Sequence, residues 1–257
     1  ERSFVADLLP DRNTGISVRN TFDGNWNWAV GSFRESNSYG DDKGNTGQGE
    51  WNHTARIAGV AWEDPNENHL FHVGAGGSYR HPADETVALK TRGNQRLSSG
   101  SFSATTLSDL SPGGTVYNLE AAYVNGPLFA DAEFARADYD ADHVPGEGIV
   151  EAWHATIGYY ITGESRTYNR KANTWGRTSP KKNYGDADGT GAVQVALRFD
   201  SWSPNEAAGA APDIDQWTAG IAWFLNPNTR ILLNFAKGQV DDLGDYDLLG
   251  MRFAIDF

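Results

Sequence analysis

The chain has 257 residues and a formal net charge of −13, which argues against nucleic acid as a partner. It contains no cysteine, and this excludes disulfides, metal–thiolate sites and thiol catalysis. Mean hydropathy is low, and no apolar run approaches the roughly eighteen residues of a membrane helix. Abundant glycine (29 residues) and aromatic residues (12%) indicate β-structure with many turns.

Period-two alternation of apolar and polar residues, bounded by Gly, Pro, Asn and Asp clusters, predicts about eleven strands and no helix of useful length. Most of these strands have about ten residues, the length of a tilted membrane-spanning strand rather than of a typical soluble one. No linker divides the chain, so we expect one domain over residues 1–257. The predicted strands are 14–20, 25–34, 52–62, 69–80, 115–124, 128–139, 149–162, 191–202, 214–225, 228–237 and 246–257.

The connections between these strands alternate between short and long. Short turns follow residues 20, 62, 124 and 225, whereas 35–51, 81–114, 140–148, 203–213 and 238–245 are mostly longer. Short turns on one side and long loops on the other are typical of outer-membrane barrels. If the C-terminus is periplasmic, the long loops are external, and the one exception is the long periplasmic connection 163–190.

The last predicted strand illustrates the two faces of this sheet. Leu249, Met251, Phe253, Ile255 and Phe257 share one side, while the other side carries Arg252 and Asp256. Most other strands repeat this pattern, with an apolar face and a polar, charged face. A soluble core would have to pair nearly every charge on that polar face, whereas a water-filled lumen holds them at little cost. The sequence therefore predicts an all-β fold, a transmembrane antiparallel β-barrel, rather than a soluble sandwich.

Inward-facing cations are the first candidate site. Arginine offers a planar, permanently charged fork suited to oxyanions, and cationic pore walls favour anions. Val60 and Trp62 share the parity of Arg56, which conflicts with its inward assignment. A second interpretation stays open, in which lumen arginines pair with inward acids such as Glu120, Asp131, Glu133, Asp200 and Asp256. By strand parity the inward set is Arg19, Arg56, Arg80, Arg198, Arg230 and Arg252.

Two long connections supply further candidates. Connection 163–190 is a basic island in an acidic chain; it would plug or line the periplasmic mouth and attract anions, or it is a solvated loop. Loop 81–114 would narrow the pore if it folds inward and is ordinary surface if it does not. The candidates from the two connections are Arg166, Arg170, Lys171 and Arg177 from the first, and Arg92 and Arg96 from the second.

Four stretches together resemble the phosphate-selective porin O and P family: ERSFVADLLPDRNTGISV, ITGESRTYNRKANTWGR with its following proline, GAVQVALRFD and GMRFAIDF. The resemblance implies a trimeric, sixteen-stranded outer-membrane barrel with inward-folded external loops and a ladder of lumen arginines. It also implies that residues 1–12 end the third external loop, which constricts the pore. Loop 81–114 would be the fifth external loop, and 163–190 an inserted periplasmic turn.

Eleven strands would then be the last eleven of sixteen. Because an open sheet leaves two unpaired edges in lipid, we expect about five further strands upstream of residue 1. We expect a homotrimer in the bacterial outer membrane, in contact with lipid, that passes small anions such as phosphate or polyphosphate. A weakly selective general diffusion porin and a structural or adhesive barrel are the alternatives. His72 and His154 point inward without a nucleophile or acid–base partner motif, so we expect no enzyme activity, cofactor or metal.

Overall fold

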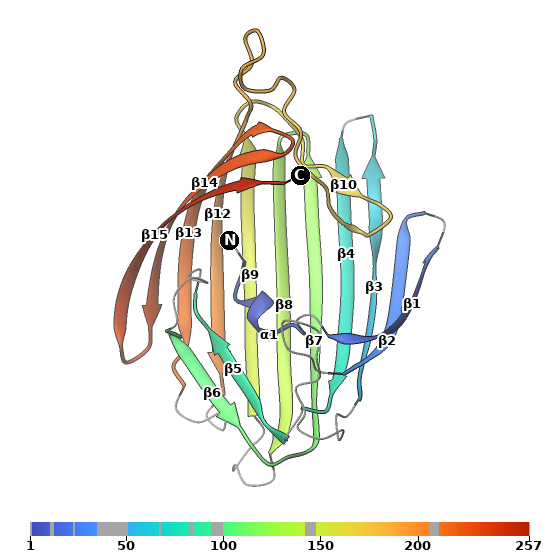
Figure 1. Ribbon diagram of the computed structural model, residues 1–257, viewed down its shortest axis with the longest axis vertical. Coiled ribbons are helices and arrows are strands. Elements are labelled where there is room, and N and C mark those ends of the chain that lie inside the picture. Colours follow the sequence, from blue (N-terminus) through green and yellow to red (C-terminus); the bar gives the residue numbers. More distant parts are fainter. Residues whose placement is uncertain are drawn as a thin grey trace.

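The computed structural model describes residues 2–10, 13–22, 24–34, 51–66, 68–82, 85–93, 100–141, 148–205 and 211–256 (Figure 1). Its main element is one antiparallel sheet of eleven strands, in which chain neighbours are also sheet neighbours. The predicted number of strands is thus confirmed for this sheet. The strands are β1 (Thr14–Phe22), β2 (Trp26–Arg34), β3 (Trp51–Asp64), β4 (His69–Arg80), β7 (Leu110–Asn125), β8 (Leu128–Ala141), β9 (Gly148–Tyr160), β12 (Ala192–Pro204), β13 (Ile214–Asn226), β14 (Thr229–Val240) and β15 (Gly244–Ile255).

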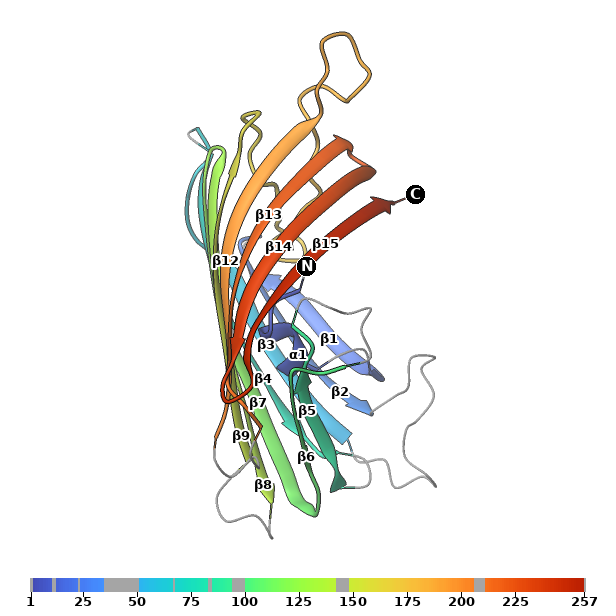
Figure 2. The ribbon, with the colours of Figure 1, turned by 90° about the vertical axis from the view of Figure 1, so that its left-hand side faces the viewer.

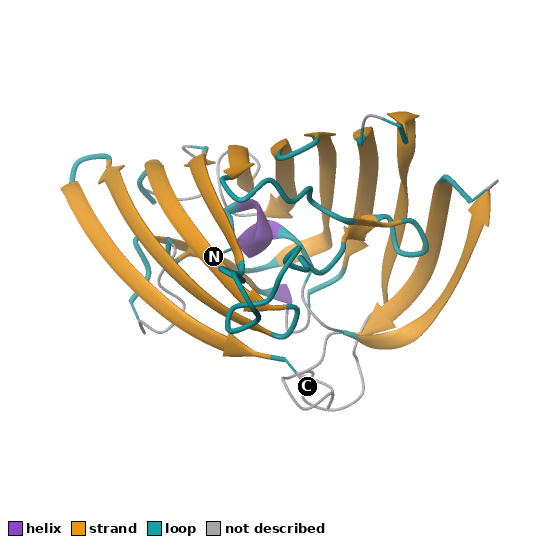
Figure 3. Cartoon of the chain, turned by 90° about the horizontal axis from the view of Figure 1, so that it is seen from above, coloured by secondary structure: helices purple, strands orange, loops and turns teal. Residues whose placement is uncertain are grey.

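The sheet curves into an open trough whose concave side holds several short elements (Figures 2 and 3). These are the helix α1 (Val5–Leu8), the hairpin of β5 (Val87–Thr91) and β6 (Ser103–Leu107), and the hairpin of β10 (Tyr168–Asn169) and β11 (Thr174–Trp175). The sequence pattern did not predict them, because segments this short carry too few residues for a periodicity. Within the described sheet, β1 and β15 each pair on one side only.

The convex face is apolar and exposed, as the alternation predicts. Leu119 is 56% exposed, Ile157 54% and Met251 79%. Two rows of aromatic side chains flank this band, because Tyr117, Trp153 and Trp217 are each followed six residues later by Tyr123, Tyr159 and Trp223. Paired aromatic belts are typical of a surface that meets two membrane interfaces. No helix in the described residues is long and apolar enough to cross a membrane.

A β-bulge in β3 resolves the parity conflict around Arg56. The register between β3 and β4 shifts between Val60 and Trp62. Val60 is 5% exposed and Trp62 is 52% exposed, so they lie on opposite faces although their numbers differ by two. An extra residue on one strand reverses the alternation beyond it. Arg56 precedes the bulge and lies on the concave face with Val60.

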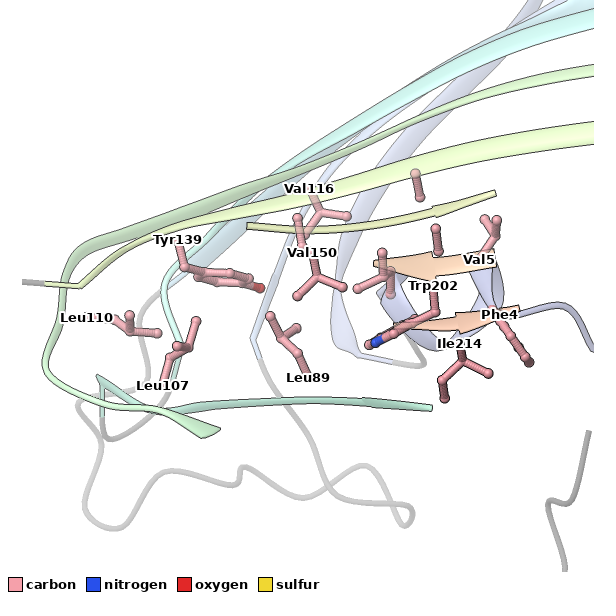
Figure 4. Close-up of a cluster of buried hydrophobic side chains, with 14 of the residues drawn as sticks. Phe4, Val5, Leu89, Leu107, Leu110, Val116, Tyr139, Val150, Trp202 and Ile214 are labelled. Atoms are coloured by element: carbon pink, nitrogen blue, oxygen red, sulfur yellow. The ribbon is translucent and has the colours of Figure 1, made fainter. Parts of the chain in front are cut away.

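The sequence predicts a polar concave face, and this prediction is wrong for one end of the sheet. Toward the end where the long loops lie, Val116, Tyr139, Val150, Trp202 and Ile214 of the wall form one buried apolar cluster (Figure 4). The cluster is completed by Phe4, Val5 and Leu8 of the N-terminal segment and by Leu89 and Leu107 of the β5–β6 hairpin.

The described part of loop 81–114 therefore folds inward, which is the interpretation in which it narrows the lumen. Burial of apolar surface against the wall supplies the driving force, because β5 and β6 form a separate two-stranded sheet with no hydrogen-bonded neighbour in the main sheet.

Polar contacts fix the N-terminal segment at the same place. The buried Asp200 carboxylate accepts the Phe4 N–H through Oδ1 at 3.2 Å and the Arg198 Nε–H through Oδ2 at 2.6 Å. Thr91 Oγ1 donates to Asp7 Oδ2 at 2.9 Å, which links α1 to the β5–β6 hairpin. The two inward-folded segments thus support each other as well as the wall.

Candidate functional site

A cavity of about 550 Å³ lies on the concave side, where the wall, the N-terminal segment and connection 163–190 meet. Four arginines line it: Arg2, Arg56, Arg166 and Arg198. Glu120, Asp131 and Glu133 are the carboxylates of the same lining, and His72 and His154 are its imidazoles. The arginines and carboxylates come from six separate parts of the chain, and the sheet curvature brings them together.

Arg56 reaches the cavity from β3 and is held by Glu120 of β7. Its Nη2 donates to Glu120 Oε1 and, at 3.4 Å, to the carbonyl oxygen of Asn173 in connection 163–190. Gly74 of β4 lies between the two strands, and a Cβ there would collide with the Glu120 carboxylate. The glycine therefore leaves the space in which the ion pair forms.

His72 of β4 shares the Glu120 carboxylate. Its Nε2 lies 3.1 Å from Glu120 Oε1, and its Nδ1 lies 2.7 Å from the Tyr168 hydroxyl. Burial raises the pKa of Tyr168 to about 12, so its hydroxyl keeps its proton at neutral pH. In the tautomer with the proton on Nε2, His72 donates to Glu120 and accepts from Tyr168. Neutral His72 is then fully hydrogen-bonded and ties connection 163–190 to the wall.

Arg166 enters the cavity from connection 163–190. Its Nη1 donates to Asp131 Oδ1 at 2.7 Å. The guanidinium carbon lies 4.6 Å from the ring centroid of Phe129 and 4.1 Å from that of Trp175. Stacking on two rings and pairing with a carboxylate orient this cation, and a lysine would not reproduce that geometry.

His154 of β9 lies between two carboxylates of β8. Its Nε2 is 3.4 Å from Glu133 Oε2, and its Nδ1 is 3.9 Å from Asp131 Oδ2. The side chain is 8% exposed. Within the described residues Nδ1 has no hydrogen-bond partner.

The remaining basic residues of connection 163–190 lie outside the cavity lining. Arg170 pairs with Glu63 of β3 and donates to Asn25 Oδ1 at 3.0 Å. Arg177 donates to Asn228 Oδ1 and lies 3.6 Å from Asp256 Oδ2 beyond β15. These two arginines brace the connection against both sides of the trough. The Lys171 side chain is exposed.

The other candidates in the described residues are not part of the cavity lining. Arg19 shares a row with Arg56, because both pair in register with Ala29 of β2. Arg80 lies opposite Gly114 at the long-loop end of the sheet, and Arg92 follows β5. Arg230 and Arg252 have inward parity on β14 and β15, with Arg252 exposed. Arg96 lies outside the described residues.

The pairing of lumen arginines with inward acids, which the sequence left open, is what the structure shows for Arg56, Arg166, Arg177 and Arg198. Arg2 was missed as a candidate. The signal for it was available, since the family resemblance assigns residues 1–12 to a constricting loop. Asn173 was also missed, and no pattern in the sequence marks it.

The family model described as phosphate-selective porin O and P matches residues 9–257. The chain belongs to this family. The sheet is therefore part of an outer-membrane β-barrel porin, and the family is one of channels rather than enzymes.

The chain is also similar to two curated proteins, and the name of the second agrees with this assignment. An uncharacterized protein of Caulobacter vibrioides is 30% identical over 154 residues, which are 55% of this chain and 30% of that protein. Porin O of Pseudomonas aeruginosa is 25% identical over 139 residues, which are 50% of this chain and 31% of that protein. The matched stretches thus span less than a third of the length of each relative.

Proposed function

We propose that the protein is a porin for passive diffusion of small anions, with phosphate or polyphosphate as the solutes. The observation that carries this proposal is the convergence of four guanidinium groups on one lumen cavity. Guanidinium forks match the planar or tetrahedral oxygens of such anions and replace part of their hydration shell. The family description supports phosphate as a solute, and the name of Porin O supports a porin.

The carboxylates in the lining limit how strong this preference is. Four arginines against three carboxylates leave one net positive charge when both histidines are neutral. An entering anion competes with Glu120 or Asp131 for a guanidinium rather than filling an empty site. Weak, exchangeable binding suits transport, because a solute held too tightly would not leave.

A weakly selective general diffusion porin is the second candidate. The specific observation in its favour is that Arg56, Arg166 and Arg198 all have carboxylate partners. In this case the pairs serve mainly to hold the loops in place. Outer-membrane lipid and a homotrimeric assembly belong to both candidates, the first supported by the aromatic rows of the convex face and the second by the family resemblance.

Bilayer conductance of the full-length protein separates the two. We expect a reversal potential that favours anions under a KCl gradient, and we expect added phosphate to reduce the chloride current. Arg166→Gln should weaken phosphate block about tenfold, the effect of losing about 1.4 kcal/mol of charge-assisted binding. Arg136→Gln is the matched control, because Arg136 lies on the convex face with Glu151 and Asp138. Cation preference, or equal block in both variants, would contradict the proposal.

A further inference from the structure

His154 is the one cavity-lining histidine in the described part of the chain whose ring has an unpartnered nitrogen. The neutral imidazole has one N–H, and a carboxylate flanks each of its ring nitrogens. A neutral ring donates its one N–H to one carboxylate. Its other nitrogen is then a hydrogen-bond acceptor that faces the second carboxylate, which is also an acceptor. The protonated ring has two N–H groups, one for Glu133 and one for Asp131. The geometry thus accommodates the charged form of His154.

His72 has the opposite surroundings. Its two nitrogens face one acceptor, Glu120, and one donor, the Tyr168 hydroxyl. The neutral ring satisfies both contacts, and a second proton would require the hydroxyl to rotate away. The two lumen histidines therefore differ in what protonation does to their hydrogen bonds.

The charges around His154 come from four elements. Asp131 and Glu133 face it from β8, and Asp131 also holds Arg166 of connection 163–190. Asp200 of β12 lies opposite His154 in register and is paired with Arg198. The N-terminal segment adds Arg2 to the same cavity.

We propose that His154 makes the ion selectivity of this lumen respond to proton concentration, its imidazolium form adding one positive charge to the cavity at mildly acidic pH. Imidazole is the ordinary side chain whose charge changes between about pH 5 and pH 8. The inference rests on the proposed permeation through this cavity. The inference goes beyond the proposed function because it names a residue, His154, that sets how strongly the lumen prefers anions at a given pH.

The expected size follows from the added charge. One unit charge about 6 Å from an ion in water raises the local anion population about threefold and lowers the cation population about threefold, and screening by salt brings the change in their ratio to about threefold. Salt reduces this, since screening acts over about 10 Å at 0.1 M, so dilute KCl is the appropriate electrolyte. Chloride and potassium do not titrate, whereas phosphate would change its own charge in the same pH range.

The experiment measures reversal potentials of the full-length protein in planar bilayers under a KCl gradient, between pH 8 and pH 5.5. We expect the chloride-to-potassium permeability ratio to rise about threefold on acidification. His154→Gln should lose most of that rise. His154→Lys, which keeps a charge at both pH values, should show a raised ratio without pH dependence and serves where the Gln variant does not assemble.

His53→Gln is the matched control. His53 is an exposed histidine of β3 whose Nδ1 lies 2.8 Å from Ser32 Oγ, and it does not line the cavity. It should keep the full wild-type rise. A rise retained in His154→Gln, a flat wild-type profile, or a rise lost in His72→Gln but not in His154→Gln would each overturn the inference.

The pH 8 measurement separates this inference from the proposed function. A wild-type ratio below one at pH 8 would refute anion preference. If that ratio still rose on acidification and His154→Gln abolished the rise, the role of His154 would stand on its own.

Discussion

Arginines that reach a porin lumen are often regarded as open anion sites, but Arg56 and Arg166 are already in contact with carboxylates. The side chain of Arg56 is 35% exposed and that of Arg166 is 23% exposed, so water screens both pairs partly. Each pair is therefore strong enough to orient its guanidinium and weak enough for an anion to compete. Anion binding by these arginines therefore depends on competition between the carboxylate partner and the solute for the guanidinium group.

Glu120→Gln tests this balance. Glu120 accepts hydrogen bonds from Arg56 and His72, and its side chain is 14% exposed. The amide keeps the shape and removes one negative charge from the lining, which raises its net charge from one to two. We expect the chloride-to-potassium permeability ratio to rise about threefold at pH 8, measured by reversal potential in dilute KCl.

Asp138→Asn is the control for this substitution. Asp138 pairs with Arg136 on the convex face, 3.3 Å from its Nη2. Its substitution by asparagine therefore changes the net charge of the protein equally but leaves the charge of the lumen unchanged. The ratio should stay at the wild-type value. An equal rise in both variants would mean that overall charge, not the cavity, sets selectivity.

Short inward segments depend on packing in a way that the wall strands do not. Each wall strand is held by a ladder of backbone hydrogen bonds on at least one side, whereas the β5–β6 hairpin reaches the wall through side chains such as Leu89 and Leu107. This dependence explains why such elements are weakly encoded in the local sequence. For the same reason, a single core substitution can detach such a short element from the wall.

Leu107→Ala is the corresponding prediction at the scale of the element. Leu107 is 3% exposed and packs onto Gly148, where a Cβ would collide with it. Leucine-to-alanine changes in cores cost about 2–5 kcal/mol, and here the cost falls on docking of the hairpin. We expect a larger and noisier single-channel conductance with normal barrel assembly. Leu243→Ala, at a 75% exposed turn residue, should leave conductance unchanged. Wild-type conductance in Leu107→Ala would contradict the idea that this hairpin narrows the lumen.

At the scale of the whole molecule, some parts of the fold could be predicted from the sequence and others could not. The number of strands and their two faces follow from period-two alternation, because lipid and water impose it on every strand. The bulge between Val60 and Trp62 was not predicted, because the sequence shows only that both residues share the parity of Arg56 and not where the register shifts. The cavity and its lining could not be predicted from the sequence either. Arg2, Arg56, Arg166 and Arg198 meet through sheet curvature and loop docking, and no local pattern specifies those contacts.

Adjacent residues on β14 test the assignment of faces across the whole wall. Leu233 is 43% exposed on the convex side, in a row with Ile221 and Met251, while Asn234 points to the concave side. A lysine on the lipid face near the bilayer midplane costs about 2–4 kcal/mol, whereas lumen substitutions mainly tune selectivity. We therefore expect Leu233→Lys to lower barrel stability by about that amount, measured by urea unfolding in lipid vesicles.

Asn234→Lys places the same charge one residue away and should keep near-wild-type stability, with a higher chloride-to-potassium ratio from the added lumen charge. The two variants share charge, strand and depth, so their difference isolates the face that each residue occupies. Equal destabilisation of both would mean that the convex face does not meet lipid at this level. Greater destabilisation of Asn234→Lys would invert the assignment of lumen and membrane for the entire sheet, because every strand is locked to its neighbour in register.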